Sequence, residues 1–254
     1  MNIFLSPVVT LIVLYFLFSI IFFRRKTITL QDWNTTYLAP LALGMVIPYH
    51  QLERVLINAM AGFWPVLFIN TSITLIEIGL LSMFVDLWLK KRKMVEFGLF
   101  PYLLLIGLGM GSGRFLRDVL LVWYHPLSHF FGYSQFSNFI TGFYLAQEIL
   151  QSLIFVICAG FLGLGYIRVN QGQHGAALFS FVSSFFILEI DAVIQVLFQY
   201  VPSFAFFSTV YVISLLPLLL ILGGGFLWFS YRRQERRESE FKKENSNISP
   251  ASFS

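Results

Sequence analysis

Long apolar stretches separated by short polar segments make up most of the chain. Six of them cover residues 3–23, 65–89, 97–122, 139–167, 176–200 and 204–231. A helix rises about 1.5 Å per residue, so each stretch is long enough to cross the hydrocarbon core of a bilayer. The alternating segments of about 10 residues that mark a membrane β-barrel are not evident. The pattern therefore predicts an all-α, polytopic membrane helix bundle.

Composition supports lipid as the solvent of this chain. Of the 254 residues, 57% are hydrophobic and only 12% are charged, about half the charged fraction of a typical soluble domain. In hydrocarbon every backbone N–H and C=O must be satisfied within the protein, which helices achieve. We therefore expect the lipid bilayer to be the main partner of the chain.

A seventh segment, 37–59, is harder to assign. It contains Pro40, Pro48, His50, Glu53 and Arg54, and its hydropathy alone gives weak support for a span. Either it crosses the membrane, or it enters and returns on the same side as a reentrant segment. Both readings fit the local sequence.

Charge distribution favours a crossing. If 37–59 spans, then the basic residues of 24–26, 90–93, Arg168 and 232–243 all fall on one side. The positive-inside rule makes that side the cytoplasm, and the loops on the other side contain no Lys or Arg. We therefore predict seven transmembrane helices with the N-terminus outside and the C-terminus inside. The tryptophans agree, because each lies at the end of a span, where indole prefers the interface: Trp33, Trp64, Trp88, Trp123 and Trp228.

The chain divides into a seven-span domain, 1–231, and a charged, partly disordered cytoplasmic tail, 232–254. The tail begins as a charged helical extension and ends in an Asn-, Ser- and Pro-rich stretch. The whole chain has a net charge of +4. Its basic residues adjoin the apolar segments as orientation signals, so no nucleic-acid partner is expected. The tail suits contact with another subunit of a membrane complex. Size and tail suggest a bacterial cytoplasmic (inner) membrane.

The fourth span carries three charged residues near one helical face. Arg114, Arg117 and Asp118 are spaced i, i+3, i+4. Charged side chains in hydrocarbon cost about 2.5 to 3.5 kcal/mol each on insertion scales, so they usually face the interior of a bundle or water. A run of small residues precedes them and would let a neighbouring helix approach closely: Gly107, Gly109, Gly111, Ser112 and Gly113.

Polar stripes recur on the neighbouring spans. The third has Asn70, Thr74 and Glu77, the fifth has Thr141, Tyr144, Glu148 and Gln151, and the sixth has Ser180, Ser184, Asp191, Gln195 and Gln199. Glu189 lies on another face of the sixth span. Since successive spans alternate in direction, residue number converts to depth. The charged groups then gather in the outer half of the membrane.

This gathering predicts a polar cavity within spans two to six that opens to the outside. The expected ligand-binding residues are Arg54, Glu77, Arg114, Arg117, Asp118, Glu148, Asp191 and Gln195. The structural alternative is a set of internal ion pairs, such as Arg114 with Asp118 or Arg117 with Glu148, that fix helix register. Asp86 and Lys90 are expected to form an ordinary i, i+4 pair at the inner interface.

Several functional classes lack the residues they require. No lysine lies inside a span, which excludes a retinal Schiff base. Phosphate-loop, HExxH and intramembrane haem-ligand patterns are not found. Cys158 is the single cysteine, and His125 and His129 have no visible third ligand. No cofactor and no metal site are therefore expected.

Three functions remain open. The leading hypothesis is a small-solute transporter or membrane binding component, with Arg114 and Arg117 holding an anionic group and Glu77, Glu148 or Asp191 binding a coupling proton or cation. The first alternative is an intramembrane enzyme acting on a lipid or lipid-linked substrate at the outer leaflet, with a carboxylate or His50 as base. The third is a sensor or assembly subunit.

Overall fold

The computed structural model describes residues 34–46, 62–92, 100–123, 142–199 and 214–248. These residues are almost entirely helical, and they contain no strand. The prediction of an all-α fold is therefore confirmed for the described part of the chain. The apolar run 3–23 and the second half of the segment 37–59 lie outside it.

The helices follow the apolar runs closely. They are η1 (Asn34–Leu38), α3 (Ala39–Val46), α5 (Phe63–Arg92), α6 (Phe100–Trp123), α8 (Gly142–Asn170), α9 (His174–Gln199) and α11 (Leu216–Ile248). The ends of α5, α6, α8 and α9 agree with the predicted spans to within three residues. In α11 the helix continues without a break past residue 231, so the charged extension is part of the last helix.

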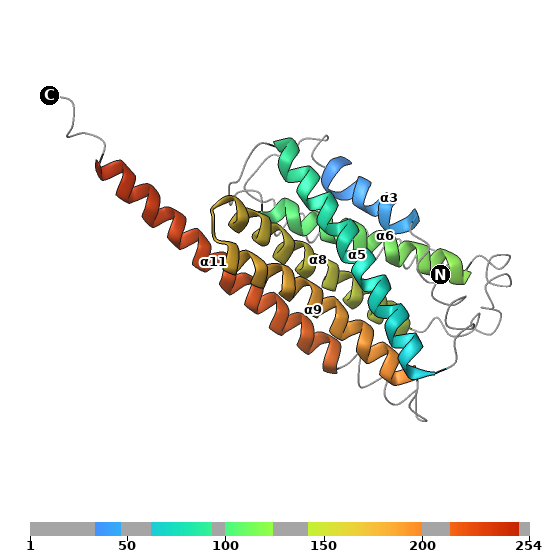
Figure 1. Cartoon of the computed structure of the whole chain (residues 1–254). Helices are drawn as coiled ribbons and strands as arrows, with labels where there is room; N and C mark the ends of the chain where they lie inside the picture. Colours follow the sequence, from blue (N-terminus) through green and yellow to red (C-terminus); the bar gives the residue numbers. More distant parts are fainter. Residues whose placement is uncertain (1–33, 47–61, 93–99, 124–141, 200–213, 249–254) are drawn as a thin grey trace.

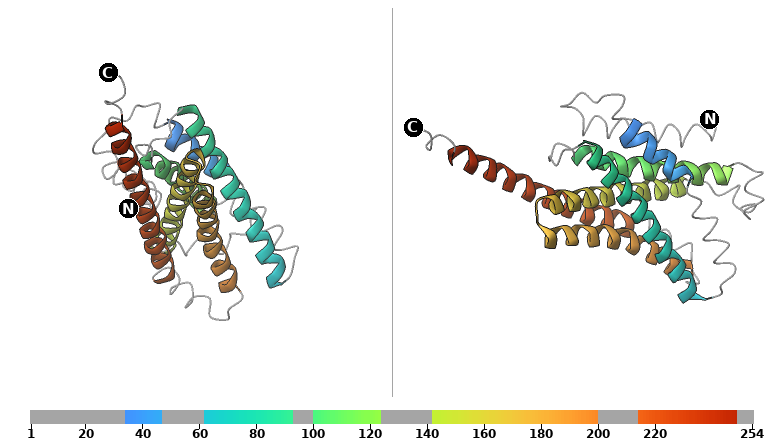
Figure 2. Two further views of the ribbon diagram at one scale, coloured as in Figure 1. Left: turned by 60° about the vertical axis from the view of Figure 1, so that its left-hand side comes forward. Right: turned by 45° about the horizontal axis from the view of Figure 1, so that its top comes forward.

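Two helices form the centre of the bundle. α6 and α8 make the most extensive contact, α9 and α11 pack on α8, and η1 and α3 pack on α6. α5 crosses the bundle obliquely and contacts mainly α9 (Figures 1 and 2). The central pair is buried nearly all round, with Phe115, Phe155 and Phe161 among the fully buried side chains. Any site built on α6 and α8 therefore lies deep in the protein.

Glycines on one face of α6 explain its closeness to α8. A Cβ at Gly107 would lie under 3.0 Å from the carbonyl oxygen of Phe155, and one at Gly111 under 3.0 Å from that of Ser152. Real Cβ atoms do not approach so closely, so only glycine allows this separation. Ser152 uses it to donate a 3.0 Å hydrogen bond to the Gly111 carbonyl.

The alternate glycines of α6 face η1 and α3. A Cβ at Gly109 would collide with the backbone of Tyr37, and one at Gly113 with the backbone of Leu41. Gly44 on α3 makes the same kind of close contact from the other side, because a Cβ added there would collide with the Met110 carbonyl oxygen of α6. The predicted small-residue run thus serves two helices rather than one, and α6 is held between them.

The outer surface of the bundle is apolar. Trp64 at the start of α5 is 75% exposed, and large apolar side chains continue along the outward faces of α5, α9 and α11. They include Phe68, Leu75, Ile76 and Met83 on α5, Leu178, Phe179, Val182 and Phe186 on α9, and Leu218, Ile221, Leu222 and Phe229 on α11.

Two helical stretches of the described residues are long and apolar enough to cross a membrane, Phe63–Lys90 and Ile149–Asn170. A shorter apolar stretch covers His174–Ile190. Residues 63–90 are in an outer helix, whereas 149–170 are in the central one, where most side chains are buried. A long apolar sequence therefore does not determine whether one of these helices lies at the centre or on the outside of the bundle.

Basic residues gather at one end of the bundle. The end of α5 with Lys90, the α8–α9 turn beside Arg168 and the start of the charged part of α11 lie at the same end (Figure 1). Lys90 pairs there with Asp86 at 2.6 Å on the surface of α5, as expected for i, i+4 partners. α11 then runs on past this end with its charged residues.

Candidate functional site

A buried polar stripe on α5 forms one wall of the site. Asn70, Thr74 and Glu77 are spaced by one turn each and all are buried. The spacing places the three side chains on one face of the helix, opposite the exposed apolar side chains. The predicted stripe on this span is therefore directed inward.

Arg114 on α6 pairs with the end of that stripe. Its Nη1 lies 3.5 Å from Oε1 of Glu77, and both side chains are largely buried. The guanidinium carbon also lies 5.6 Å from the centre of the Phe155 ring on α8. One arginine thus links three helices, through a charge on one side and an aromatic face on the other.

Arg117, one turn further along α6, is buried as well, and only 6% of it is exposed. Ser112 on the same helix lies within hydrogen-bonding reach of the Tyr37 hydroxyl of η1. The charged part of α6 is therefore enclosed by α5, α8 and the η1–α3 segment. Burial of two arginines within four residues concentrates positive charge inside the bundle.

Gln151 supplies a polar group from α8. Its side chain is buried, and its Nε2 has no hydrogen-bond partner among the described residues. A buried amide donor without an acceptor costs about 1 to 3 kcal/mol. A hydrogen-bond acceptor placed level with Gln151 would therefore be favourable.

Contacts between α8 and α9 show which residue of α9 lies level with Gln151 of α8. The Ser184 hydroxyl donates to the Cys158 carbonyl at 3.2 Å, and the Cys158 thiol donates to the Ser184 carbonyl at 3.4 Å. α8 and α9 are antiparallel. Gln151 lies seven residues, or two turns, before Cys158 on α8, and position 191 lies seven residues after Ser184 on α9. The two positions are then at one height and on the facing sides of α8 and α9.

Glu189 belongs to a different contact. Its Oε1 accepts a 2.5 Å hydrogen bond from the Thr71 hydroxyl of α5, and its Oε2 is buried with no partner among the described residues. This agrees with the prediction that Glu189 lies on another face of the sixth span. It joins α9 to α5 instead of facing α8.

Of the predicted ligand-binding residues, the structure pairs Glu77 with Arg114, and Arg117 is buried one turn further along α6. Four others are on described helices, but their side chains lie outside the described part: Asp118, Glu148, Asp191 and Gln195. Arg54 and the histidines of the 124–141 segment are outside it altogether. Within the described residues, no group of three or more His, Cys, Asp or Glu side chains could hold a metal ion.

Arg168 is the residue whose environment the sequence did not indicate. The sequence predicts that Arg168 is one of the basic residues at the cytoplasmic surface that set the orientation of the spans, yet only 8% of it is exposed. The short turn before α9 is the relevant feature, because a tight helical hairpin returns the first turns of α9 alongside the end of α8, within reach of the long Arg168 side chain. The Ser180 hydroxyl indeed accepts a 2.7 Å hydrogen bond from Arg168.

The chain matches no protein-family model, no curated protein and no solved structure. The geometry of the buried charges and the surface around them are therefore the basis for the function of the chain.

Proposed function

We propose that the chain is an integral membrane protein whose seven helices cross the bilayer, with the basic ends in the cytoplasm. Its distribution of side chains supports this, because large apolar residues lie on the outside while Glu77 and Arg117 are buried and Arg114 is largely buried. A soluble bundle has the opposite arrangement. The clustering of Lys90, Arg168 and the α11 arginines at one end fits the positive-inside rule.

The buried polar residues bind the anionic group of a small polar solute that enters from the outside. The Glu77–Arg114 pair, with Arg117 one turn away, is the observation that carries this function. Arginine is suited to the role because its planar guanidinium offers paired donors to carboxylate or phosphate. Asn70, Thr74 and Gln151 add neutral hydrogen-bonding groups around the charges.

Binding and proton uptake are coupled through Glu77. When the anion engages Arg114, the guanidinium exchanges the Glu77 carboxylate for the solute. A carboxylate left without a counter-charge in a low-dielectric interior is costly, so Glu77 then takes up a proton. Transport of the solute together with a proton follows if access alternates between the two faces of the membrane.

Asp191 and Glu148 form the second acidic part of the site. Position 191 shares its height with Gln151, whose free amide donor is suited to a carboxylate. Glu148 is three residues before Gln151, so its position is on nearly the same face of α8. With Asp118 and Gln195, these residues extend the polar surface on the outer side of the Glu77–Arg114 pair.

A binding and flux experiment tests this function. Purified protein in proteoliposomes is assayed with inorganic phosphate, succinate and sulfate, with an imposed proton gradient in either direction. We expect uptake of at least one anion, accelerated by the inward proton gradient and abolished in Arg114→Gln. Glu77→Gln should still bind the anion in detergent but lose the response to the gradient. Asp86→Asn, at the other end of α5, is the matched control and should behave as the parent protein.

Product analysis separates transport from catalysis. The same proteoliposomes, prepared with bacterial lipids, are extracted and their lipids compared before and after incubation. A new lipid species that depends on Arg114, without anion uptake, would make the protein an intramembrane enzyme and overturn the transport proposal. No uptake, no binding and no product, with the variants folded as the parent, would leave the buried charges a purely structural role.

A further inference from the structure

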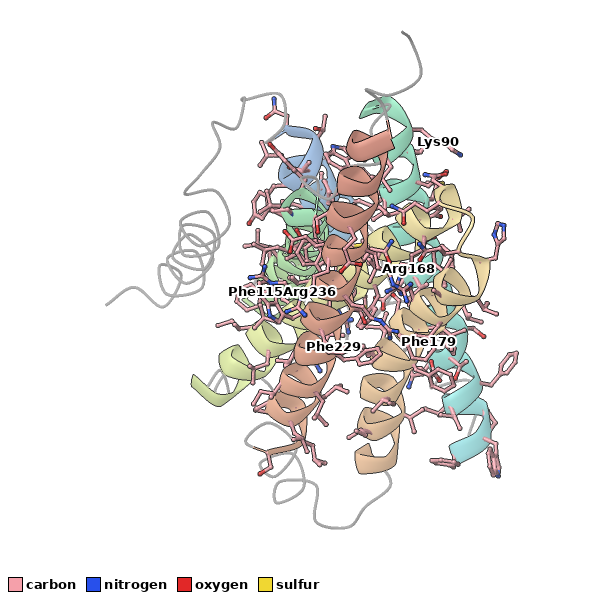
Figure 3. All side chains as sticks on the ribbon, turned by 90° about the vertical axis from the view of Figure 1, so that its left-hand side faces the viewer. Lys90, Phe115, Arg168, Phe179, Phe229 and Arg236 are labelled. Carbon is pink, nitrogen blue, oxygen red and sulfur yellow. The ribbon has the colours of Figure 1, made fainter. Side chains whose placement is uncertain are left out.

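Arg168 occupies the place where α8, α9 and α11 come together, at the basic end of the bundle (Figure 3). Its Nη1 donates to the Ala176 carbonyl at 3.1 Å and to the Ser180 hydroxyl at 2.7 Å. These two bonds fix the guanidinium against the first turns of α9. Its Nε is buried and has no hydrogen-bond partner among the described residues.

Helix α11 places two more arginines beside it. A buried stripe on α11 faces α8 through Leu227, Ser230 and Gln234, and the Gln234 amide donates to the Gln171 side chain in the α8–α9 turn. Arg233 and Arg237 flank Gln234 along α11, so the Gln234–Gln171 contact brings this turn of α11, with both arginines, to the end of α8 near Arg168. Both are exposed, whereas Arg168 is buried.

The charge of this group is not neutralised within the described part of the chain. No described carboxylate forms an ion pair with Arg168, and the charged groups that act on it are both cations. Glu235, which lies between Arg233 and Arg237 along α11, pairs with Arg232 at 3.1 Å. A buried cation with two further cations nearby is costly unless an anion is present.

We propose that Arg168, Arg233 and Arg237 form a binding site for a phosphate group, distinct from the solute site between α5, α6 and α8. Arg168 is the fixed base of the site, and the two exposed arginines close over the phosphate oxygens. Arginine clusters recognise phosphate in this way because each guanidinium offers several directed donors. The phosphate comes either from the headgroup of an anionic lipid or from a soluble phosphate compound.

The position on α11 favours a lipid headgroup. Among the side chains of this helix that the structure describes, the large exposed apolar ones end at Trp228 and Phe229. Arg232 packs on the Trp228 ring, with its guanidinium carbon 4.6 Å from the ring centre. Arg233 follows directly. The site therefore begins where the apolar surface ends, which is the height of lipid phosphates for a protein in a bilayer.

Thermal unfolding of the full-length protein in detergent tests the site. The additives are phosphatidic acid, phosphatidylcholine as the lipid control, and inorganic phosphate without lipid. A ligand that binds the folded state raises the unfolding midpoint with increasing concentration. We expect phosphatidic acid to raise it, phosphatidylcholine to leave it unchanged, and inorganic phosphate to raise it only if the site takes the soluble form.

Two double variants of equal charge decide whether the site is specific. Arg233→Gln with Arg237→Gln should weaken the apparent affinity for phosphatidic acid by about tenfold or more, since charge-assisted hydrogen bonds are lost. Arg232→Gln with Arg236→Gln removes the same charge from the same part of α11 and should retain the parent affinity. Arg168→Gln, which keeps a donor for Ser180, should lose affinity as the first double variant does.

Three results would overturn the proposal. The first is an equal loss in the two double variants, which would reduce the effect to general surface charge. The second is no shift with either phosphatidic acid or inorganic phosphate. The third is a parent-like response in folded Arg168→Gln, which would remove the buried arginine from the site.

Discussion

At the scale of single residues, burial decides what an ion pair contributes. The surface pair Lys90–Asp86 is shorter, at 2.6 Å, than the buried pair Arg114–Glu77, at 3.5 Å. Water and salt screen the first, whereas the second lies where little water can replace a lost partner. The longer contact, Arg114–Glu77, is therefore expected to contribute more to stability than Lys90–Asp86.

A double-mutant cycle on the buried pair measures this. Glu77→Ala should lower the free energy of unfolding by about 3 kcal/mol, because it leaves Arg114 without that counter-charge, and Arg114→Ala should act similarly. The double variant should cost less than the sum of the two single variants. Denaturation in mixed micelles gives the four values. Additive effects would mean that the two side chains are not coupled, and Asp86→Ala should cause little change.

Residue environments were only partly readable from the sequence. The i, i+4, i+7 spacing predicts that Asn70, Thr74 and Glu77 share a face, because helix geometry alone requires it. That Glu77 meets Arg114 depends on the oblique path of α5, which no local pattern encodes. Arg168 shows the same limit, since its burial results from a tertiary contact with α9.

At the scale of helices, the glycines of α6 set the distance to two neighbours at once. Gly107 and Gly111 face α8, while Gly109 and Gly113 face η1 and α3. For helices surrounded by lipid, where no hydrophobic force draws helices together, close backbone approach would be one of the main contributions to packing. The sequence predicted one close neighbour for this run, and the alternation of faces along the helix provides the second.

Alanine substitutions in α6 test these contacts. Gly107→Ala and Gly113→Ala should each lower the free energy of unfolding by about 1 to 3 kcal/mol, because the added methyl group meets backbone that must move. Gly79→Ala on α5 is the control, since nothing lies within 4 Å of its Cβ. There alanine should be neutral or slightly stabilising. Equal stability of all three variants would contradict the close packing of α6.

Pairing between α8 and α9 gives a test of register. With Cys158 replaced by serine, Gln151→Cys and Asp191→Cys should form a disulfide under mild oxidation, since both positions are at one height on facing sides. Gln151→Cys with Ile187→Cys, one turn away along α9, should cross-link poorly. Electrophoresis after protease cleavage between the helices separates the products. Preferred cross-linking to position 187 would shift the register and detach Asp191 from the site.

At the scale of the whole molecule, side chains are distributed as expected for a protein that lipid surrounds. Helix positions and lengths followed from apolar runs, because a bilayer requires long apolar helices whatever their partners. Which helices lie at the centre did not follow. α5 and α8 are both apolar along their length, yet α5 has an exposed face and α8 is buried, a difference set by packing with α6, α9 and α11.

The orientation of the molecule can be tested with single cysteines in a Cys158→Ser background. Intact cells are treated with a membrane-impermeant thiol reagent, and the same cells are labelled again after permeabilisation. Lys90→Cys and Arg236→Cys are both at the basic end of the bundle. They should react only after permeabilisation, because the positive-inside rule places that end in the cytoplasm. Phe63→Cys, at the opposite end of α5, should react in intact cells. The reverse pattern would turn the buried Glu77–Arg114 site towards the cytoplasmic half, and the solute would then have to enter from inside.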